Sequence, residues 1–114
     1  MAKLQGLDDT GFVYVPNQCS GKSGCKLHVA FHGCSQSRTF MGRDYAQDTG
    51  YLEWAGTNGI IVLFPQAKPV TVKANPNGCW DFWGYGYKSD YLSKDGVQTA
   101  AVKAMIDRIT SDPQ

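Results

Sequence analysis

The sequence has no excess of charge of either sign and no long apolar run. Its 114 residues carry 11 Lys and Arg against 10 Asp and Glu, for a formal net charge of +1. So balanced a charge gives no electrostatic reason to bind nucleic acid or an anionic membrane, and we expect neither partner. No segment approaches the run of about 18 apolar residues that a membrane span needs. The N-terminal "MAKLQGLDDT" lacks the apolar core of a signal peptide.

A Cys-x-x-Cys pair is also missing, which removes the usual spacing of zinc ribbons and thioredoxin-like sites. The four cysteines are Cys19, Cys25, Cys34 and Cys79. Three disulfide connectivities are possible, and the most economical joins Cys19 to Cys25 and leaves Cys34 to meet Cys79. By chain entropy these bonds would be worth about 2.4 and about 4 kcal/mol. Disulfides imply an oxidising compartment, so we expect an extracellular protein; the alternative is four reduced thiols in a cytosolic one.

Metal-binding patterns are absent as well. Asp44 and Asp48 lie four residues apart on an expected helix, and Asp8 and Asp9 precede an expected strand. Neither pair has the companion ligands of a metal site. We therefore expect no metal and no cofactor.

Hydrophobic patterning predicts one α/β domain over residues 1–114. A chain of this length can bury roughly 65% of its unfolded surface. Residues 11–15 and 26–31 are rich in β-formers and are expected to pair with each other. A helical stretch, ended by Asn58-Gly59, leads to "IIVLF" at 60–64, a run typical of a parallel strand buried on both faces. After an ordered loop at 65–92, a capping signal at Asp95 and Gln98 predicts a helix from Val97 to about Thr110.

The stretch "LHVAFHGCSQS", residues 27–37, carries the main functional signal. Ligands of parallel α/β sheets bind beyond the carboxyl ends of the strands, which is where His32, Gly33 and Cys34 fall. A His-Gly motif after an early strand supplies one oxyanion-hole amide in α/β-hydrolases. Gly33 would let the backbone turn the next amide outward, and a disulfide at Cys34 would hold that amide still.

A catalytic triad is the most important absence. No serine lies in a G-x-S-x-G elbow, and Ser35, the nearest to one, has Ser37 where the second glycine should be. His32 lies three residues from Ser35 in the same loop, which makes a Ser35/His32 pair improbable, and His28 alternates along a strand as a core or sheet-face residue would. A Cys34 thiolate nucleophile is equally disfavoured because an even number of cysteines favours pairing. We therefore expect the chain to be inactive on its own.

Four segments together resemble the C-terminal portion of extracellular poly(3-hydroxybutyrate) depolymerases, and the circularly permuted, single-domain fungal type most of all. They are "GLDDTGFVYVPNQC", "LHVAFHGCSQS", "DTGYLEWAGTNGIIVLFPQA" and "NPNGCWDFWGYG", in the order of that family and covering most of the chain from Gly6 onward. The resemblance implies a partial α/β-hydrolase sheet of about three or four strands with flanking helices, stabilised by disulfides. It also implies a secreted serine esterase whose substrate is this polyester or a related short hydroxyalkanoate ester.

The resemblance assigns roles to particular residues. Cys34 matches the residue whose backbone N–H forms one arm of the oxyanion hole, Trp80 matches an aromatic that packs on the substrate, and Asn75 matches a neighbour in the same crevice. Cys79 would then be the partner of Cys34. The loop between Pro65 and Asn75 departs from the family by being shorter.

The family also accounts for the missing triad. In the permuted type the nucleophile, acid and histidine lie N-terminal to this region, so the chain would be the C-terminal segment and its partner the catalytic segment. In a non-permuted relative, the nucleophile strand would instead follow Thr110.

Two alternatives remain open from the residues alone. The aromatic run from Trp80 to Tyr91 could make the chain a non-catalytic module that binds a polymer or carbohydrate. The chain could also be a non-functional remnant that oligomerises through an exposed sheet edge. The aromatic residues of the run are Trp80, Phe82, Trp83, Tyr85, Tyr87 and Tyr91.

Overall fold

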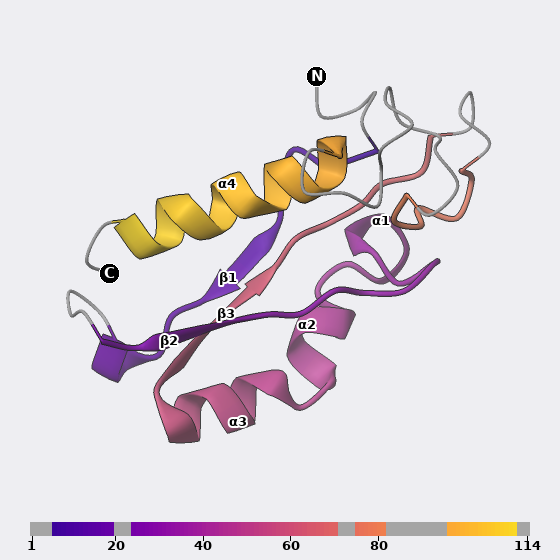
Figure 1. Ribbon diagram of the computed structural model, residues 1–114. Helices are drawn as coiled ribbons and strands as arrows, with labels where there is room; N and C mark the ends of the chain where they lie inside the picture. The colour runs from indigo at the N-terminus through magenta and orange to yellow at the C-terminus, as the bar shows by residue number, and fades with distance from the viewer. Residues whose placement is uncertain (1–5, 20–23, 71–74, 82–95, 112–114) are drawn as a thin grey trace.

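The computed structural model describes residues 6–19, 24–70, 75–81 and 96–111 (Figure 1). In this part of the chain, a sheet of three strands has the order β1-β3-β2. β1 covers Phe12–Tyr14, β2 covers Lys26–Val29 and β3 covers Ile60–Phe64. β3 pairs parallel with β2 and antiparallel with β1. The mixed α/β architecture predicted from the sequence is confirmed, with the number of described strands at the lower end of the expected range.

The predicted pairing of the first two strands with each other is wrong. β3 lies between them, with Val62 opposite Tyr14 on one side and opposite His28 on the other. The reason lies in "IIVLF", which is apolar on both faces of its strand and is stabilised most at the centre of the sheet. Local patterns at β1 and β2 show that each is a strand but not which neighbour it takes.

Short helices connect β2 to β3. They are α1 at Arg38–Met41, α2 at Asp44–Asp48 and α3 at Tyr51–Asn58. Gly42 and Gly50 have φ values of 56° and 90°, a left-handed backbone that glycine adopts without steric cost. These glycines divide the stretch that the sequence predicted as helical. Gly59, with φ 66°, ends α3 at the expected place.

The last described helix, α4, covers Val97–Ser111 and agrees with the predicted helix. Figure 1 shows α4 on the side of the sheet opposite α1–α3. A short 3-10 helix, η1 at Asn17–Cys19, follows β1. None of the helices in the described ranges is long and apolar enough to cross a membrane. Asp95, the expected cap of α4, lies outside the described residues.

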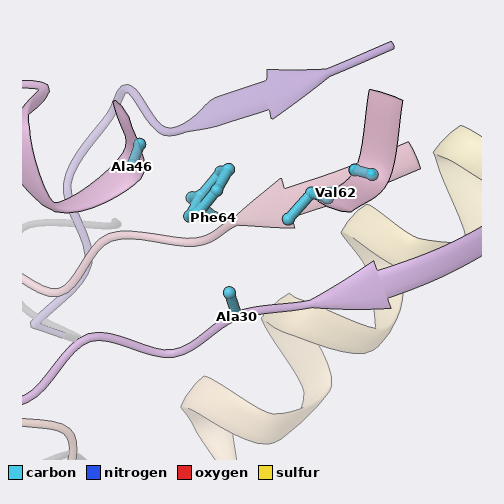
Figure 2. Close-up of a cluster of buried hydrophobic side chains, with 5 residues drawn as sticks. Ala30, Ala46, Val62 and Phe64 are labelled. Atoms are coloured by element: carbon cyan, nitrogen blue, oxygen red, sulfur yellow. The ribbon is translucent and has the colours of Figure 1, made fainter. Parts of the chain in front are cut away.

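The buried core lies between the sheet, with β3 at its centre, and the helices α2 and α3 (Figure 2). Val62 and Phe64 have exposed fractions of 0% and 1%, and they join Ala30, Ala46 and Ala55 in one cluster. The small alanines allow α2 and α3 to approach the strand closely. The other face of β3 carries Ile61 and Leu63, which are also buried. The prediction that this strand is buried on both faces is confirmed.

The described residues contain two disulfides. Cys19 is bonded to Cys25 and Cys34 to Cys79, with Cα–Cα distances of 5.9 and 4.3 Å. The first closes the loop between η1 and β2. The second spans 45 residues and joins the loop after β2 to the loop after β3.

Replacing Phe64 by alanine tests the central position of β3. We expect Phe64→Ala to lower the free energy of unfolding by about 3–5 kcal/mol, because it leaves a cavity among close-packed side chains. Phe40→Ala is the matched control, since the Phe40 side chain is 45% exposed. Denaturant unfolding of both variants measures the difference, and equal losses would contradict the core described here.

Candidate functional site

The backbone after β2 leaves the sheet and is then held by side chains. The last ladder bond is donated by the Ala30 N–H to the Leu63 carbonyl, at 2.9 Å. Beyond it, the Phe31 carbonyl accepts the Tyr45 hydroxyl at 2.8 Å, and the His32 carbonyl accepts the Trp80 indole N–H at 3.0 Å. Both carbonyls, which lie beyond the last ladder bond, thus accept a side-chain donor from another element.

The chain then reverses in a tight turn over residues 33–36. The Gln36 N–H donates to the Gly33 carbonyl at 3.3 Å, and the Gln36 side chain accepts the Gly33 N–H at 2.6 Å. Ser35 has φ 60°, the left-handed value that the third residue of a type II turn takes. The sequence led us to assign the unusual backbone to Gly33, and the structure instead places it at Ser35. A Cβ at position 33 would lie 2.8 Å from the Gln36 amide oxygen, so the flexible Gln36 side chain would have to move aside.

A second loop, residues 75–79, is fastened against this turn. The Cys34–Cys79 disulfide joins the two covalently, and the Ser35 N–H donates to the Asn77 carbonyl at 2.7 Å. The Cys34 N–H, by contrast, has no acceptor within hydrogen-bonding distance in the part of the chain that the structure describes. Cys34 itself is exposed. The turn therefore holds, in an exposed residue, one backbone donor without a described acceptor between two bonded neighbours.

Asn75 holds the second loop in shape. Its side chain is 1% exposed. The amide nitrogen donates to the Cys79 carbonyl and the amide oxygen accepts the Cys79 N–H, both at 3.0 Å. Its backbone forms a pair of hydrogen bonds with Val70. The structure thus places Asn75 behind the disulfide, where it positions Cys79.

Trp80 lies directly beside the turn. Its ring stacks on His32 with centroids 5.1 Å apart and meets Phe31 edge-on at 5.3 Å. The indole is half-buried, and its N–H is engaged with the His32 carbonyl. The structure therefore brings Cys34, Cys79 and Trp80 together, as the sequence predicted.

An apolar cavity of about 520 Å³ opens next to Trp80. It lies between the end of β2 and one face of α4. Four of its eight lining residues are aromatic or aliphatic and four are polar or charged, a mixture of apolar wall and polar groups that suits small-molecule sites. Its lining residues are Phe31, Trp80, Asp81, Gln98, Thr99, Val102, Lys103 and Ile106.

His32 is buried, and both of its ring nitrogens are in use. Nε2 accepts the Ala67 N–H at 3.0 Å, so Nδ1 carries the proton and donates it to the Gly33 carbonyl at 2.7 Å. Burial lowers the pKa of His32, although the bond to Gly33 opposes that effect. A neutral imidazole with no free nitrogen cannot act as a general base. The structure therefore gives no support to a Ser35/His32 pair.

His28 lies elsewhere, on the sheet face that packs against α3. Its ring meets those of Tyr51 and Trp54, each with a centroid distance of 5.3 Å. This agrees with the sheet-face position expected for it. In the described ranges, no group of three His, Cys, Asp or Glu side chains is placed to hold a metal ion.

Sequence reasoning missed several residues, distant in the chain, that form hydrogen bonds with the segment from Phe31 to Arg38. Gln66 is one: its side-chain oxygen accepts the Arg38 N–H at 2.7 Å, at the start of α1. Tyr45 and Ala67 are others. The proximity of Gln66-Ala67 to the carboxyl end of β3 was the available signal, because adjacent parallel strands end at one edge of a sheet. Of the expected aromatic run, Phe82, Trp83, Tyr85, Tyr87 and Tyr91 lie outside the described residues.

Replacing Asn75 tests its positioning role. We expect Asn75→Ala to lower the free energy of unfolding by about 2–4 kcal/mol, because the two buried hydrogen bonds between the Asn75 side chain and the Cys79 backbone are lost. Asn77→Ala is the matched control, since Asn77 is exposed and holds the turn only through its carbonyl. Thermal or denaturant unfolding measures both variants, and an Asn75→Ala loss as small as that of the control would contradict the clamp.

Comparison with known proteins gives a consistent picture. No family model matches the chain. A poly(3-hydroxybutyrate) depolymerase of Delftia acidovorans is 46% identical over 108 residues, and a polyhydroxybutyrate depolymerase of Talaromyces funiculosus is 47% identical over 117 residues. Each alignment covers 93% of this chain but only 21% and 34% of the respective relative. The chain thus spans a fifth to a third of the length of these curated relatives.

Solved structures agree with the sequence relatives. The crystal structure of a PHB depolymerase from Penicillium funiculosum superposes with a TM-score of 0.87 at 43% identity, covering 96% of this chain and 37% of that one. A PHB depolymerase complexed with an R3HB trimer gives the same values. The described sheet, its flanking helices and its two disulfides therefore form part of an α/β-hydrolase fold. Over nearly all of its length, this chain is homologous to a portion of the polyhydroxybutyrate depolymerases.

Proposed function

We propose that this chain is one part of a secreted serine esterase that hydrolyses poly(3-hydroxybutyrate) or related short hydroxyalkanoate esters. It contributes one oxyanion-hole amide, from Cys34, and an aromatic substrate-binding surface, from Trp80. The observation that carries the proposal is the Cys34 N–H of an exposed residue, which lacks an acceptor among the described residues while the N–H groups on either side of it are bonded.

The chemistry follows from that amide. When a serine attacks an ester carbonyl, negative charge develops on the carbonyl oxygen, and N–H donors fixed beforehand stabilise it. Hydrogen bonds to Gly33 and Ser35 on either side, and a disulfide at Cys34 itself, restrict the motion of the Cys34 N–H. A donor held in this way needs little reorganisation when the charge appears.

Substrate binding falls to the cavity beside Trp80. The hydroxybutyrate repeat is a short aliphatic ester, so apolar and aromatic walls suit its hydrocarbon part. Phe31 and Trp80 both line the cavity, and Trp80 also stacks on His32, which directly precedes the Cys34 turn. We propose that Asn75 serves this site indirectly, because its side chain is spent on the Cys79 backbone. A direct contact between Asn75 and substrate stays a prediction.

The nucleophile and base come from another segment in this proposal, with residues 1–114 forming a single C-terminal unit that lacks the nucleophile elbow. His32 does not supply the base, because both of its ring nitrogens are hydrogen-bonded to backbone groups. β2 pairs with β3 along one edge, and no other described strand pairs with its second edge. Because the Cys34 turn follows β2, a strand added parallel to β2 at that second edge would end beside the turn.

A second candidate is a non-catalytic module that adsorbs a polymer. The half-buried Trp80 and the apolar cavity favour it. Such a module would be retained on polymer granules by itself, and Trp80→Ala would abolish the retention. The esterase proposal expects weak retention of the isolated chain.

A hybrid enzyme tests the esterase proposal. In it, this chain replaces the matching segment of the Talaromyces funiculosus depolymerase. We expect the isolated chain to release no p-nitrophenol from short p-nitrophenyl esters above background, and the hybrid to release it in a reaction that serine-directed inhibitors block. A folded but inactive hybrid, or serine-inhibitor-sensitive activity in the isolated chain, would contradict the proposed division of labour.

A pair of hybrid variants isolates the Cys34 amide. Both carry Cys79→Ala, and one adds Cys34→Ala while the other adds Cys34→Pro. Neither has the disulfide, but only the proline variant lacks the N–H, and proline suits the second position of a type II turn. We expect kcat to be about 100- to 1,000-fold lower with proline than with alanine, the usual effect of losing one oxyanion donor. Equal kcat values would show that this amide plays no part.

A further inference from the structure

In the peptide unit between Gly33 and Cys34, the carbonyl group is hydrogen-bonded and the N–H group has no described acceptor. Its carbonyl oxygen, which belongs to Gly33, accepts His32 Nδ1–H at 2.7 Å and the Gln36 N–H at 3.3 Å. Its N–H, which belongs to Cys34, has no acceptor among the described residues. A peptide unit is planar, so a bond that fixes the C=O direction also fixes the N–H direction.

His32 is itself held on several sides. Nε2 accepts the Ala67 N–H at 3.0 Å, so the ring is locked between the loop after β3 and the turn. One face stacks on Trp80, and Tyr45 from α2 meets the ring at a centroid distance of 6.3 Å. Only the neutral tautomer with the proton on Nδ1 satisfies both backbone partners.

We propose that His32 is a positioning residue, which orients and polarises the Cys34 oxyanion amide through the Gly33 carbonyl and ties that amide to Trp80. This inference rests on the proposed function of Cys34. A donor at the carbonyl end of a peptide draws electron density from its nitrogen, so the N–H becomes a stronger donor, as in cooperative hydrogen-bond chains. His32 therefore acts on the reaction without touching the substrate.

Protonation of His32 should undo this arrangement. A second proton would sit on Nε2 and face the Ala67 N–H, where two donors oppose each other. Burial lowers the pKa of His32, so the stability that the neutral ring contributes is fully present above the usual histidine pKa. It is lost as the pH falls through the lowered value. Burial raises the pKa of Tyr45, the titratable group facing the ring from α2, so Tyr45 stays neutral throughout.

Nitrogen-15 NMR of the full 114-residue chain tests the geometry without any catalysis. We expect ring shifts of the Nδ1–H tautomer for His32 at pH 7. On acidification, the Cys34 amide and the Trp80 indole N–H should shift with one shared midpoint below that of an exposed histidine. This midpoint should vanish in His32→Asn and persist in His28→Asn, the matched control. A ring protonated on Nε2 at pH 7, or a shared midpoint that survives His32→Asn, would overturn the inference.

Two substitutions in the active hybrid test the effect on the reaction. Both His32→Asn and His32→Leu lose the acceptor for Ala67, but the asparagine amide can still donate to the Gly33 carbonyl. We expect kcat to fall about 10- to 100-fold with leucine, because even a small misplacement of a group that contacts the transition state costs rate on this scale, and to recover in part with asparagine, with KM little changed. Equal kcat values for the two variants would show that the bond from His32 to the Gly33 carbonyl has no effect on the reaction, and would contradict the inference. An inactive parent hybrid would count against the esterase proposal, whereas the NMR result stands apart from it.

Discussion

The structure of the site depends on one cross-link between two loops. The Cys34–Cys79 disulfide joins the loop after β2 to the loop after β3, at the edge where both parallel strands end. Asn75 clamps the Cys79 backbone on one side of this bond, and Trp80 follows it on the other. A single covalent constraint thus sets the distance between the amide of Cys34 and the aromatic surface.

Beyond the sheet, side chains replace strand neighbours as backbone partners. Tyr45, Trp80 and His32 donate to three successive carbonyls, those of Phe31, His32 and Gly33. Each donor comes from an element that also packs on the core or lines the cavity. These hydrogen bonds connect the turn to the packed part of the molecule. The Cys34 N–H is therefore restrained even though the backbone around it is irregular.

The sequence predicted the parts of this structure that depend on local composition. The apolar run at residues 60–64 identified a strand buried on both faces, and loop economy favoured the observed cysteine pairs. Strand order was not predictable, because the sequences of β1 and β2 do not indicate which strand each pairs with. The partners of the His32 ring were beyond reach for a similar reason: Ala67 lies 35 residues away, and only the packed fold brings its N–H to Nε2. The left-handed backbone at Ser35 was not predictable either, because the residue there is not glycine, the usual sequence signal for a positive φ.

The central claim is that the Cys34 N–H meets the negative charge formed during ester hydrolysis. A crystal structure of the hybrid enzyme inhibited by an alkyl phosphonate, which mimics the tetrahedral intermediate, tests it most directly. Our account predicts a phosphonyl oxygen about 2.7–3.1 Å from the Cys34 nitrogen, with the alkyl chain against Trp80. A phosphonyl oxygen that points away from the turn, or a Cys34 N–H bonded to another protein group, would contradict it.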